Sequence, residues 1–473
     1  MTAEAQPKRL KLPHTLVLIY LLVLAVYILG LVLPAGEFRR VEKKVQQQTR
    51  LVTVPGTYHR VERPRLGPHW LLTAPVKGFQ DGALIIGLVF IFGGVFAILG
   101  RTGALEAGIH RLAAWFANRP RLRRAMIPAL MLIFSIAGAT YGMSEEAIPF
   151  VLIFIPLAIS LGYDSIVGVA IPFLGSAIGF SAAFFNPFTV GIAQSFADLP
   201  IYSGLGYRLA LWILGTAIST TFVMVYAERV YRDPRRSPVF ELDRTRETAE
   251  SSGRETPVWG ARHILVLSVL GVGMALLVVG ILAWDWYMEE IAALFLAVGI
   301  LAGLIGRLSP SVMAECFVRG ARDMMNVALI IAIGRAVLIV LQQAGVLDTI
   351  LYGAAAAIAR VPGVFTAQVM LLVQAVINFF VHSGTAQAAL TMPVMAPLSD
   401  LVGVTRQTTV LAFQLCEVIN PILPTSAVTM GVLGVAKIPW EKWARWFMPL
   451  MLLLLFFSLL ALIPPVLLHW GPF

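Results

Sequence analysis

Charged residues are scarce in this sequence of 473 residues. Asp, Glu, Lys and Arg together make up 13% of it, whereas a soluble domain carries about 25%. Hydrophobic residues reach 58%, and apolar runs long enough to span roughly 30 Å of hydrocarbon recur from 16–33 to 447–468. The shortage of charge therefore excludes an ordinary soluble protein and predicts an all-α polytopic membrane protein.

Cysteine is also rare, since Cys316 and Cys416 are the only two. Neither lies in a Cys/His cluster, so we expect no disulfide framework, no metal site and no cofactor beyond a coupling Na⁺ or H⁺. The formal charge of +10 is carried largely by loops that flank the apolar runs, where positive residues set the orientation. This placement argues for the lipid bilayer, and against nucleic acid, as a partner.

The sequence divides into five parts on this interpretation. Lys8, Arg9 and Lys11 precede the first apolar run and predict a cytoplasmic N-terminus in a bacterial inner membrane. No cleavage site of the A-x-A type follows, so we expect a retained first span. The parts are 1–77, the first span and a small extracytoplasmic hairpin; 78–227, the first repeat; 228–262, a cytoplasmic linker; 263–319, connecting spans; and 320–473, the second repeat.

Residues 35–77 are expected to lie outside the membrane and to be extended. We predict strands over 38–45 and 51–61, with a turn at Pro55-Gly56. After the next span, residues 103–118 place apolar side chains on one helical face, which predicts an amphipathic interfacial helix.

An internal repeat links the two large parts. The segment from Gly78 matches the segment from Gly320 at a constant offset, 320 − 78 = 242, and pairs Asp81 with Asp323. On the predicted topology the two copies enter the membrane from opposite sides. Such inverted repeats are typical of secondary transporters, whose binding sites lie near the membrane midplane. Coincidence is the alternative, because apolar matches are common in membrane proteins.

Two polar tips interrupt apolar stretches, at 140–146 in the first repeat and 382–385 in the second. The arms on either side, such as 127–139, are short for a membrane span. Each tip with its arms therefore predicts a re-entrant hairpin. Non-helical backbone at membrane depth requires protein or a wet cavity to satisfy its polar groups.

The helix after each predicted hairpin is interrupted, at 186–189 in the first repeat and at 420–426 in the second, and both interruptions begin with an Asn-Pro step, Asn186-Pro187 and Asn420-Pro421. Proline removes a backbone donor and disfavours a helical residue before it. The two tips and the two helix interruptions, which we call breaks, place short helix ends at one depth in the membrane. The amides at helix N-termini can bind anions, and the carbonyls at helix C-termini can bind Na⁺ or an ammonium group. A structural kink is the alternative for each step.

Ionisable residues at membrane depth are expensive and are interpreted first as functional. Glu417 lies one helical turn before Asn420 and is a candidate for coupling to a proton or cation, with His382 as a second candidate. A hydrogen bond at the tip is the alternative for His382. Glu145 and Glu146 either face the solute or stabilise the first turn of a helix.

The charges also bear on the solute. Carboxylates near the tips suit an amine or guanidinium group, while backbone amides and hydroxyls suit a carboxylate. Neither tip contains Arg or Lys, so the pattern favours an amino acid, with a basic one among the candidates, over a dicarboxylate. Arg335 lies within a span and is expected to be structural, as are Asp81 and Asp323.

Several stretches of the sequence resemble one known family, namely 33–38, 54–59, 142–146, 186–194, 420–431 and 438–443. They are similar to the YfcC-like branch of the C4-dicarboxylate anaerobic carrier (DcuC-like) family, within the ion transporter superfamily. The resemblance covers nearly the whole chain. It implies a homodimer whose scaffold and transport domains move relative to one another as an elevator. Ile422-Leu423 depart from the pattern by lengthening the stretch between Pro421 and Pro424.

The tips, the breaks and the resemblance together predict a substrate-binding set: Gly142, Ser144, Glu145, Glu146, Asn186, Thr189, Ser383, Gly384, Thr385, Asn420, Thr425 and Ser426. The function expected is secondary transport or exchange of a small charged solute by alternating access, with a channel as one alternative. An intramembrane enzyme is another. However, His382 and Ser383 are sequence neighbours, poorly placed as base and nucleophile, and no H-E-x-x-H motif occurs. We therefore expect no catalytic residues.

Overall fold

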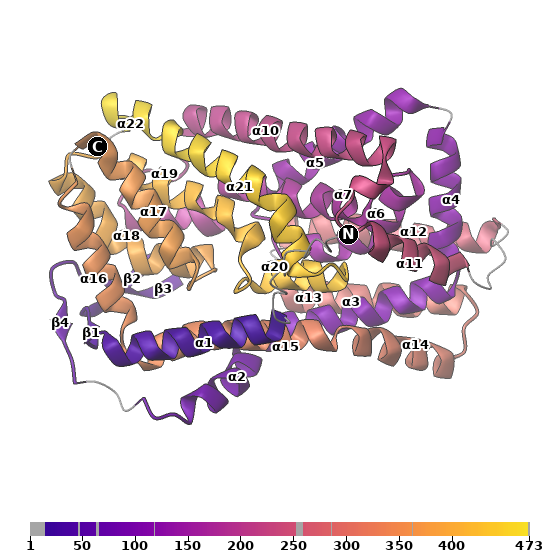
Figure 1. Ribbon diagram of the computed structural model, residues 1–473, viewed down its shortest axis with the longest axis horizontal. Coiled ribbons are helices and arrows are strands. Elements are labelled where there is room, and N and C mark those ends of the chain that lie inside the picture. Colours follow the sequence, from indigo (N-terminus) through magenta and orange to yellow (C-terminus); the bar gives the residue numbers. More distant parts are fainter. Residues whose placement is uncertain are drawn as a thin grey trace, which may run out of the picture.

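The computed structural model describes residues 15–45, 48–62, 66–117, 119–251, 259–284, 286–361 and 363–471. Within these ranges the chain is mostly helical (Figure 1). Eight of its helical segments are long and apolar enough to cross a membrane: 83–101, 121–140, 205–232, 261–281, 288–305, 325–343, 406–435 and 440–467. The prediction of an all-α polytopic membrane protein is thus confirmed. Lys8, Arg9 and Lys11, on which the predicted orientation rests, lie outside the described residues.

The elements follow one another in this order: α1 (Thr15–Val32), β1 (Gly36–Glu37), β2 (Arg40–Val45), β3 (Gln48–Thr53), β4 (His59–Arg60), α2 (Trp70–Asp81), α3 (Ala83–Arg101), α4 (Ala104–Ala117), α5 (Pro120–Thr140), α6 (Ala147–Ser160), α7 (Ser165–Val169), the π-helical turn η1 (Ala170–Leu174), α8 (Gly175–Ser181), the π-helical turn η2 (Pro187–Gly191), α9 (Ile192–Phe196), α10 (Leu205–Arg232), the 3₁₀ turn η3 (Pro234–Arg236), α11 (Phe240–Ser251), α12 (Ala261–Trp284), α13 (Met288–Ile305), α14 (Pro310–Asp323), α15 (Met325–Gln343), α16 (Leu347–Ile358), the 3₁₀ turn η4 (Gly363–Phe365), α17 (Thr366–Asn378), α18 (Gly384–Leu401), α19 (Arg406–Leu415), the 3₁₀ helix η5 (Cys416–Ile422), α20 (Ala427–Val435), α21 (Trp440–Ala461) and α22 (Ile463–Leu467).

The extended segment after α1 pairs differently from the prediction. β2 and β3 are antiparallel, with Val45 opposite Gln48, while β1 pairs with β4. The main hairpin is therefore 40–53, and Pro55-Gly56 forms a second turn between β3 and β4, where Gly56 has a φ of +73°. The turn at Pro55-Gly56 is thus present, but the single expected strand 51–61 is divided into β3 and β4, and the hairpin between β2 and β3 was missed because neither glycine nor proline marks their connection.

The repeat seen in the sequence recurs in the helix bounds. α3 and α15 begin at residues 83 and 325 and end at 101 and 343, so both ends differ by 242 (325 − 83 and 343 − 101). Each helix is followed by a glycine with positive φ, Gly103 at +73° and Gly345 at +65°. The long helix therefore ends in the same way in both copies.

In each copy, the helix before the long helix packs against the long helix of the other copy. α2 packs against α15 and α14 packs against α3, and Figure 1 shows α14 beside α3 along one long side of the molecule. A β-carbon on Gly78 would lie 2.0 Å from the carbonyl oxygen of Ala332, and one on Gly320 would lie 2.0 Å from that of Gly93. Small residues allow helices to approach this closely. This reciprocal packing indicates a pseudo-two-fold relation between the copies.

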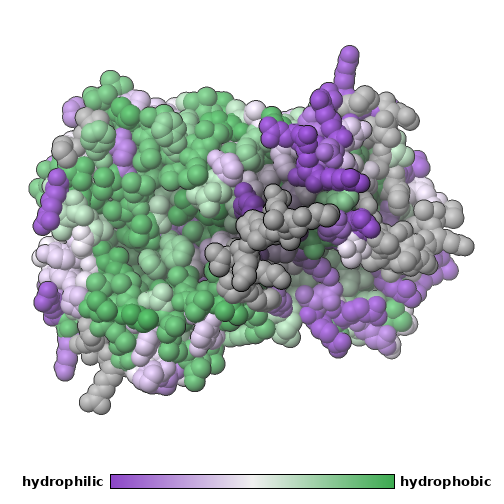
Figure 2. All heavy atoms as spheres, in the orientation of Figure 1, coloured by the Kyte–Doolittle hydropathy of each residue, from purple (hydrophilic) through white to green (hydrophobic). Residues whose placement is uncertain are grey.

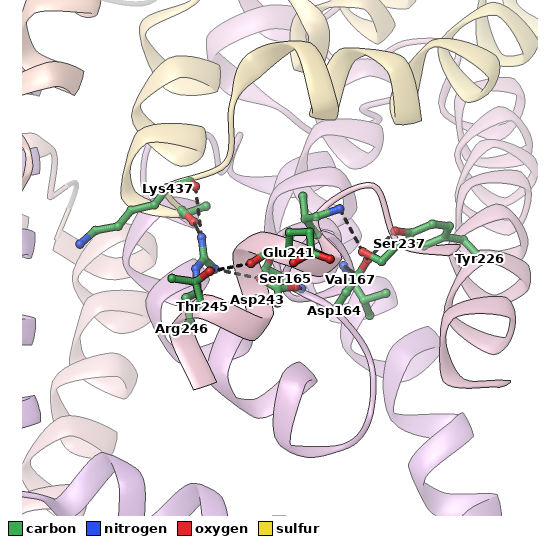
Figure 3. A network of polar contacts seen from close by, with 12 residues as sticks. Asp164, Ser165, Val167, Tyr226, Ser237, Glu241, Asp243, Thr245, Arg246 and Lys437 are labelled. Carbon is green, nitrogen blue, oxygen red and sulfur yellow. Dashed lines mark hydrogen bonds and ion pairs between the residues drawn. The ribbon is translucent and has the colours of Figure 1, made fainter. Parts of the chain in front are cut away.

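The predicted linker 228–262 is partly helical. α10 continues to Arg232, and α11 follows after a 3₁₀ turn. Asp243 on α11 accepts a hydrogen bond from the backbone amide of Ser165 at 2.8 Å, and Arg246 donates to the carbonyls of Ala436 and Lys437 (Figure 3). We call these three contacts the linker latch. These hydrogen bonds hold α11 against the start of α7 in the first repeat and against the end of α20 in the second repeat.

A second group of polar contacts lies beside the latch. Asp164, between α6 and α7, is buried and accepts hydrogen bonds from Tyr226 on α10, from Ser237 at 2.7 Å and from the amide of Val167 at 2.9 Å (Figure 3). The side chain of Asp164 therefore caps α7 and ties it to α10 and to the chain that leads into α11.

Hydrophobic residues gather on the surface. Figure 2 shows them across the left and middle of one face, between hydrophilic residues at the left edge and a larger hydrophilic group on the right. Large apolar side chains are exposed on α1, α10, α12 and α21, among them Leu21, Ile213, Val272 and Phe456. A contiguous apolar surface of this kind suits contact with lipid.

Candidate functional site

The first tip lies against the first break. α5 ends at Thr140 and α6 begins at Ala147, and Gly142 between them has a φ of +79°. A β-carbon on Gly142 would lie 2.8 Å from Oδ1 of Asn186. Asn186 is fully buried, and its Oδ1 accepts hydrogen bonds from the amides of Phe188 at 2.9 Å and Thr189 at 3.3 Å. Its side chain therefore starts the helix after the break, as an N-cap does.

One arm of the first predicted hairpin is longer than expected. α5 covers 21 residues from Pro120, whereas the apolar stretch suggested 127–139 only. Arg121, Arg123 and Arg124 continue the helix because a basic residue is a good helix former. The expectation that both arms are too short to span was therefore wrong for this arm.

The second tip lies against the second break. α17 ends at Asn378 and α18 begins at Gly384. Nε2 of His382 is 2.6 Å from Oγ1 of Thr425, and this hydroxyl donates its proton to the carbonyl of Phe379 at 3.0 Å. His382 thus makes a hydrogen bond at the tip, which is the alternative role that the sequence predicts for it.

The second tip also reaches the first break. Oγ1 of Thr385 donates to the carbonyl of Phe188 at 2.8 Å. A β-carbon on Gly384 would lie 2.5 Å from Cγ2 of Thr189 and 3.5 Å from Oε1 of Glu417. The second tip therefore touches both breaks, and all four interruptions of the sequence meet in one region.

The two breaks differ in construction: the second lies within the predicted stretch 420–426 but begins after the Asn420-Pro421 step. Helical turns continue through this step to Ile422 as a 3₁₀ helix. Asn420 donates its side-chain amide to Oε2 of Glu417 instead of capping a helix. The next helix is capped by Ser426, which accepts from the amide of Thr429 at 3.3 Å. The inserted Ile422-Leu423 accounts for the difference, because it moves the extended residues beyond the Asn-Pro step.

A cavity of about 870 Å³ opens between the tips and breaks. Every predicted substrate-binding or ion-coupling residue lines it except Asn186, which is fully buried beside the lining residue Pro187. Sequence reasoning missed Tyr141 in the first tip and several lining residues from other elements: Phe180, Tyr202, Trp286, Tyr287 and Arg335. A charge within a span was the signal that could have identified Arg335.

Charge in the cavity is mainly negative. Glu145, Glu146 and Glu417 line it, and Arg335 is the permanently positive residue among the lining residues that the structure describes. Nη1 of Arg335 is 3.3 Å from Oδ2 of Asp81. Glu146 accepts a hydrogen bond from the amide of Ser144 at 2.9 Å, so this carboxylate also stabilises the turn before α6.

Several buried polar atoms around the cavity lack a hydrogen-bond partner within the described part of the chain. They are Nδ2 of Asn186, Oγ1 of Thr189, Oε1 of Glu417 and Oδ1 of Asn420. Buried polar atoms are normally paired, so these atoms are available to a solute, an ion or water. No group of three or more His, Cys, Asp or Glu residues that could hold a metal ion occurs in the described ranges.

Comparison with known proteins identifies relatives over almost the full length. The sequence pattern of the family described as C4-dicarboxylate anaerobic carrier, DcuC, matches residues 12–467. The chain is 37% identical over 475 residues to the "Putative basic amino acid antiporter YfcC" of Escherichia coli, covering 93% of each chain. It is 30% identical over 421 residues to an uncharacterised protein of Haemophilus influenzae, covering 88% of this chain and 82% of that protein.

Two solved transporters are similar at 18% sequence identity. The YdaH transporter of Alcanivorax borkumensis matches with a TM-score of 0.41, covering 97% of this chain and 100% of that one. MtrF of Neisseria gonorrhoeae, described as illuminating a class of antimetabolite efflux pumps, matches with a TM-score of 0.42 and 98% coverage of both chains. Given the relatives in sequence, this chain is a membrane transporter that belongs to the C4-dicarboxylate anaerobic carrier family, on the YfcC-like branch.

Proposed function

We propose that this protein is a secondary transporter that exchanges amino acids, basic ones in particular, by alternating access. The observation that carries the proposal is the charge of the cavity. Three carboxylates and one guanidinium line it among the described residues, and a basic amino acid offers two cationic groups for the carboxylates and one carboxylate for the guanidinium.

A C4-dicarboxylate is the alternative that the family description suggests. Such a solute would bring two negative charges beside Glu145, Glu146 and Glu417. Like charges in a medium of low dielectric repel strongly, and Arg335 alone cannot balance them. The name of the Escherichia coli relative, which refers to basic amino acids, supports the same choice.

Glu417 is the proposed coupling residue. Its side chain is 2% exposed, and a buried carboxylate requires a proton or a cation beside it. Oε1 of Glu417 lacks a partner among the described residues and faces Gly384 of the second tip. Binding of H⁺, Na⁺ or a cationic solute at this oxygen would link the charge state of the site to the position of the tip.

The movement we propose is that of an elevator, in which inverted repeats carry the two tips as re-entrant hairpins past a scaffold. The pseudo-two-fold packing of α2 and α14 between the copies supports such a scaffold. We also propose a homodimer in a bacterial inner membrane with a cytoplasmic N-terminus. Cross-linking and labelling of single cysteines from either side of the membrane test these two points.

Uptake into proteoliposomes tests the proposed function. Vesicles loaded with unlabelled lysine should take up labelled lysine or arginine, and empty vesicles should take up far less. A matched set loaded with succinate tests the dicarboxylate alternative. Ohmic current without a counter-solute would indicate a channel, and a cleaved product would indicate an enzyme; either result would overturn the proposal.

A further inference from the structure

We infer that Arg335 binds the carboxylate of the transported amino acid and so selects amino acids against the amines that lack this group. The inference rests on the proposed function and adds to it a residue and a selectivity. It concerns a side chain that belongs to neither tip and neither break, but to the long helix α15.

The position of Arg335 is fixed by its neighbour. A β-carbon on Gly334 would lie 3.4 Å from the carbonyl oxygen of Thr425, so this turn of α15 lies directly against the second break. Thr425 in turn contacts His382 at the second tip. Arg335 therefore reaches the cavity beside the second break, in a lining that also holds the three carboxylates.

The guanidinium is only partly used in the structure. It forms an ion pair with Asp81 through Nη1 at 3.3 Å, and the side chains of Arg335 and Asp81 are 32% and 51% exposed. A guanidinium carries five donors and favours bidentate contact with a carboxylate, so donors remain for a carboxylate that arrives from the cavity.

A positive charge at this depth is costly unless it has a function or a partner. Asp81 lies on α2, outside the cavity lining. It pairs with the arginine side chain while the site is empty. When a solute binds, its carboxylate meets Arg335 and its ammonium groups meet the glutamates. An amine without the carboxylate keeps the second interaction and loses the first.

Two other arrangements compete with this one. The helix N-termini capped by Ser383 and Ser426 face the cavity and could hold a carboxylate through backbone amides. Alternatively, Arg335 could serve only as the partner of Asp81. The three possibilities predict different behaviour when the solute loses its carboxylate.

The test compares lysine with cadaverine, and arginine with agmatine, as ligands of the purified full-length protein. Binding is measured by calorimetry or thermal shift at one pH and salt concentration. The native protein should prefer each amino acid, and Arg335→Gln should reduce that preference by roughly tenfold or more, since hydrogen bonds to charged groups are strong. Binding of the amines should be equal or tighter in the variant.

Asp81→Asn is the matched control. It removes the ion pair but keeps the guanidinium, so its preference for lysine over cadaverine should stay. Loss of preference in Asp81→Asn equal to that in Arg335→Gln would mean that Arg335 acts only as a structural partner. Unchanged preference in Arg335→Gln would assign the carboxylate to the helix N-termini. Both results overturn the inference.

Failure of the proposed function looks different. If the native protein binds neither amino acids nor their amines but binds succinate, the function itself is wrong. Should Arg335→Gln fail to fold, Arg335→Lys retains the charge without the planar fork. We then expect a preference between those of the native protein and zero, and a preference equal to the native one would contradict a bidentate contact.

Discussion

The side-chain amide of Asn420 donates a hydrogen bond to Oε2 of Glu417 and leaves Oε1 of the same carboxylate buried without a partner among the described residues. The two residues lie one turn apart in a 3₁₀ helix that ends at the second break. The carboxylate is thus held in one orientation by its neighbour while its other oxygen stays available. This arrangement suits a group that binds and releases a proton or cation.

Glu417→Gln should weaken the coupling of solute exchange to H⁺ or Na⁺. The amide is uncharged at every pH, so exchange by the variant should vary less with pH and with Na⁺ than exchange by the native protein. Rates of lysine exchange between pH 5.5 and 8.5, with and without Na⁺, provide the measurement. An unaltered pH and Na⁺ profile would remove Glu417 from the coupling role.

Asn186→Ala should abolish transport while the protein stays folded in the membrane. The substitution removes an N-cap, which costs about 1 kcal/mol, and leaves Gly142 without the side chain against which the first tip packs. Labelled lysine uptake and size-exclusion chromatography report activity and folding. Asn186→Ser distinguishes the causes: serine restores the cap, so rescue would assign Asn186 a positioning role, and lack of rescue would assign a role to its free Nδ2.

Asn420→Ala should likewise abolish transport, because it frees the carboxylate of Glu417 from its fixed orientation. Asn420→Asp adds a second carboxylate beside the first and should also be inactive. Uptake and monodispersity are measured as for Asn186. Native rates in both Asn186→Ala and Asn420→Ala would refute a solute site at the tips and breaks.

Thr425→Val should loosen the second tip. The hydroxyl joins His382 and the carbonyl of Phe379, and its loss leaves both partners unsatisfied at a cost of about 1–3 kcal/mol. We expect faster hydrogen exchange at 379–385 and weaker lysine binding. Thr221→Val, at an exposed position of α10, is the isosteric control and should change neither quantity. Equal exchange rates in the two variants would show that the tip is held by other contacts.

Arg246→Ala should release the linker latch. It removes the hydrogen bonds to the carbonyls of Ala436 and Lys437, so the free energy of unfolding should fall by about 1–3 kcal/mol. Arg244→Ala on the same helix alters an exposed ion pair at 4.0 Å and should stay within about 0.5 kcal/mol. Denaturation in detergent compares the two. Similar losses would mean that α11 is held by other contacts.

Local signals in the sequence located most of the architecture. Apolar runs gave the spans, and glycine, proline and polar residues gave the tips and breaks, because each acts on the backbone at its own position. The β pairing at 40–53 lacked such a marker, and so did α2, whose helix contains Pro75. Proline signals a helix end more often than an interior position.

The site could be predicted only in part for a different reason. Glu417 and Asn420 are neighbours in the sequence, so their partnership was visible there. Arg335 reaches the cavity because α15 packs against residue 425, and a single sequence does not record which helices touch. The two extra residues Ile422-Leu423 are visible in the sequence. Their effect on the position of the second break depends on the backbone conformation of these residues, which the sequence alone does not give.

The unequal breaks have an energetic consequence if the protein alternates between two orientations, as proposed above. If the two repeats were identical, exchanging their conformations would give two states of equal free energy, and the two states would be equally populated. Here the first break opens into a π-helical turn capped by Asn186, and the second closes a 3₁₀ helix that ends at Ile422. The two orientations therefore differ in backbone hydrogen bonds and in solvation. Under the proposed movement, the empty carrier would therefore rest mainly on one side of the membrane, and a solute would have to supply binding energy to redistribute it.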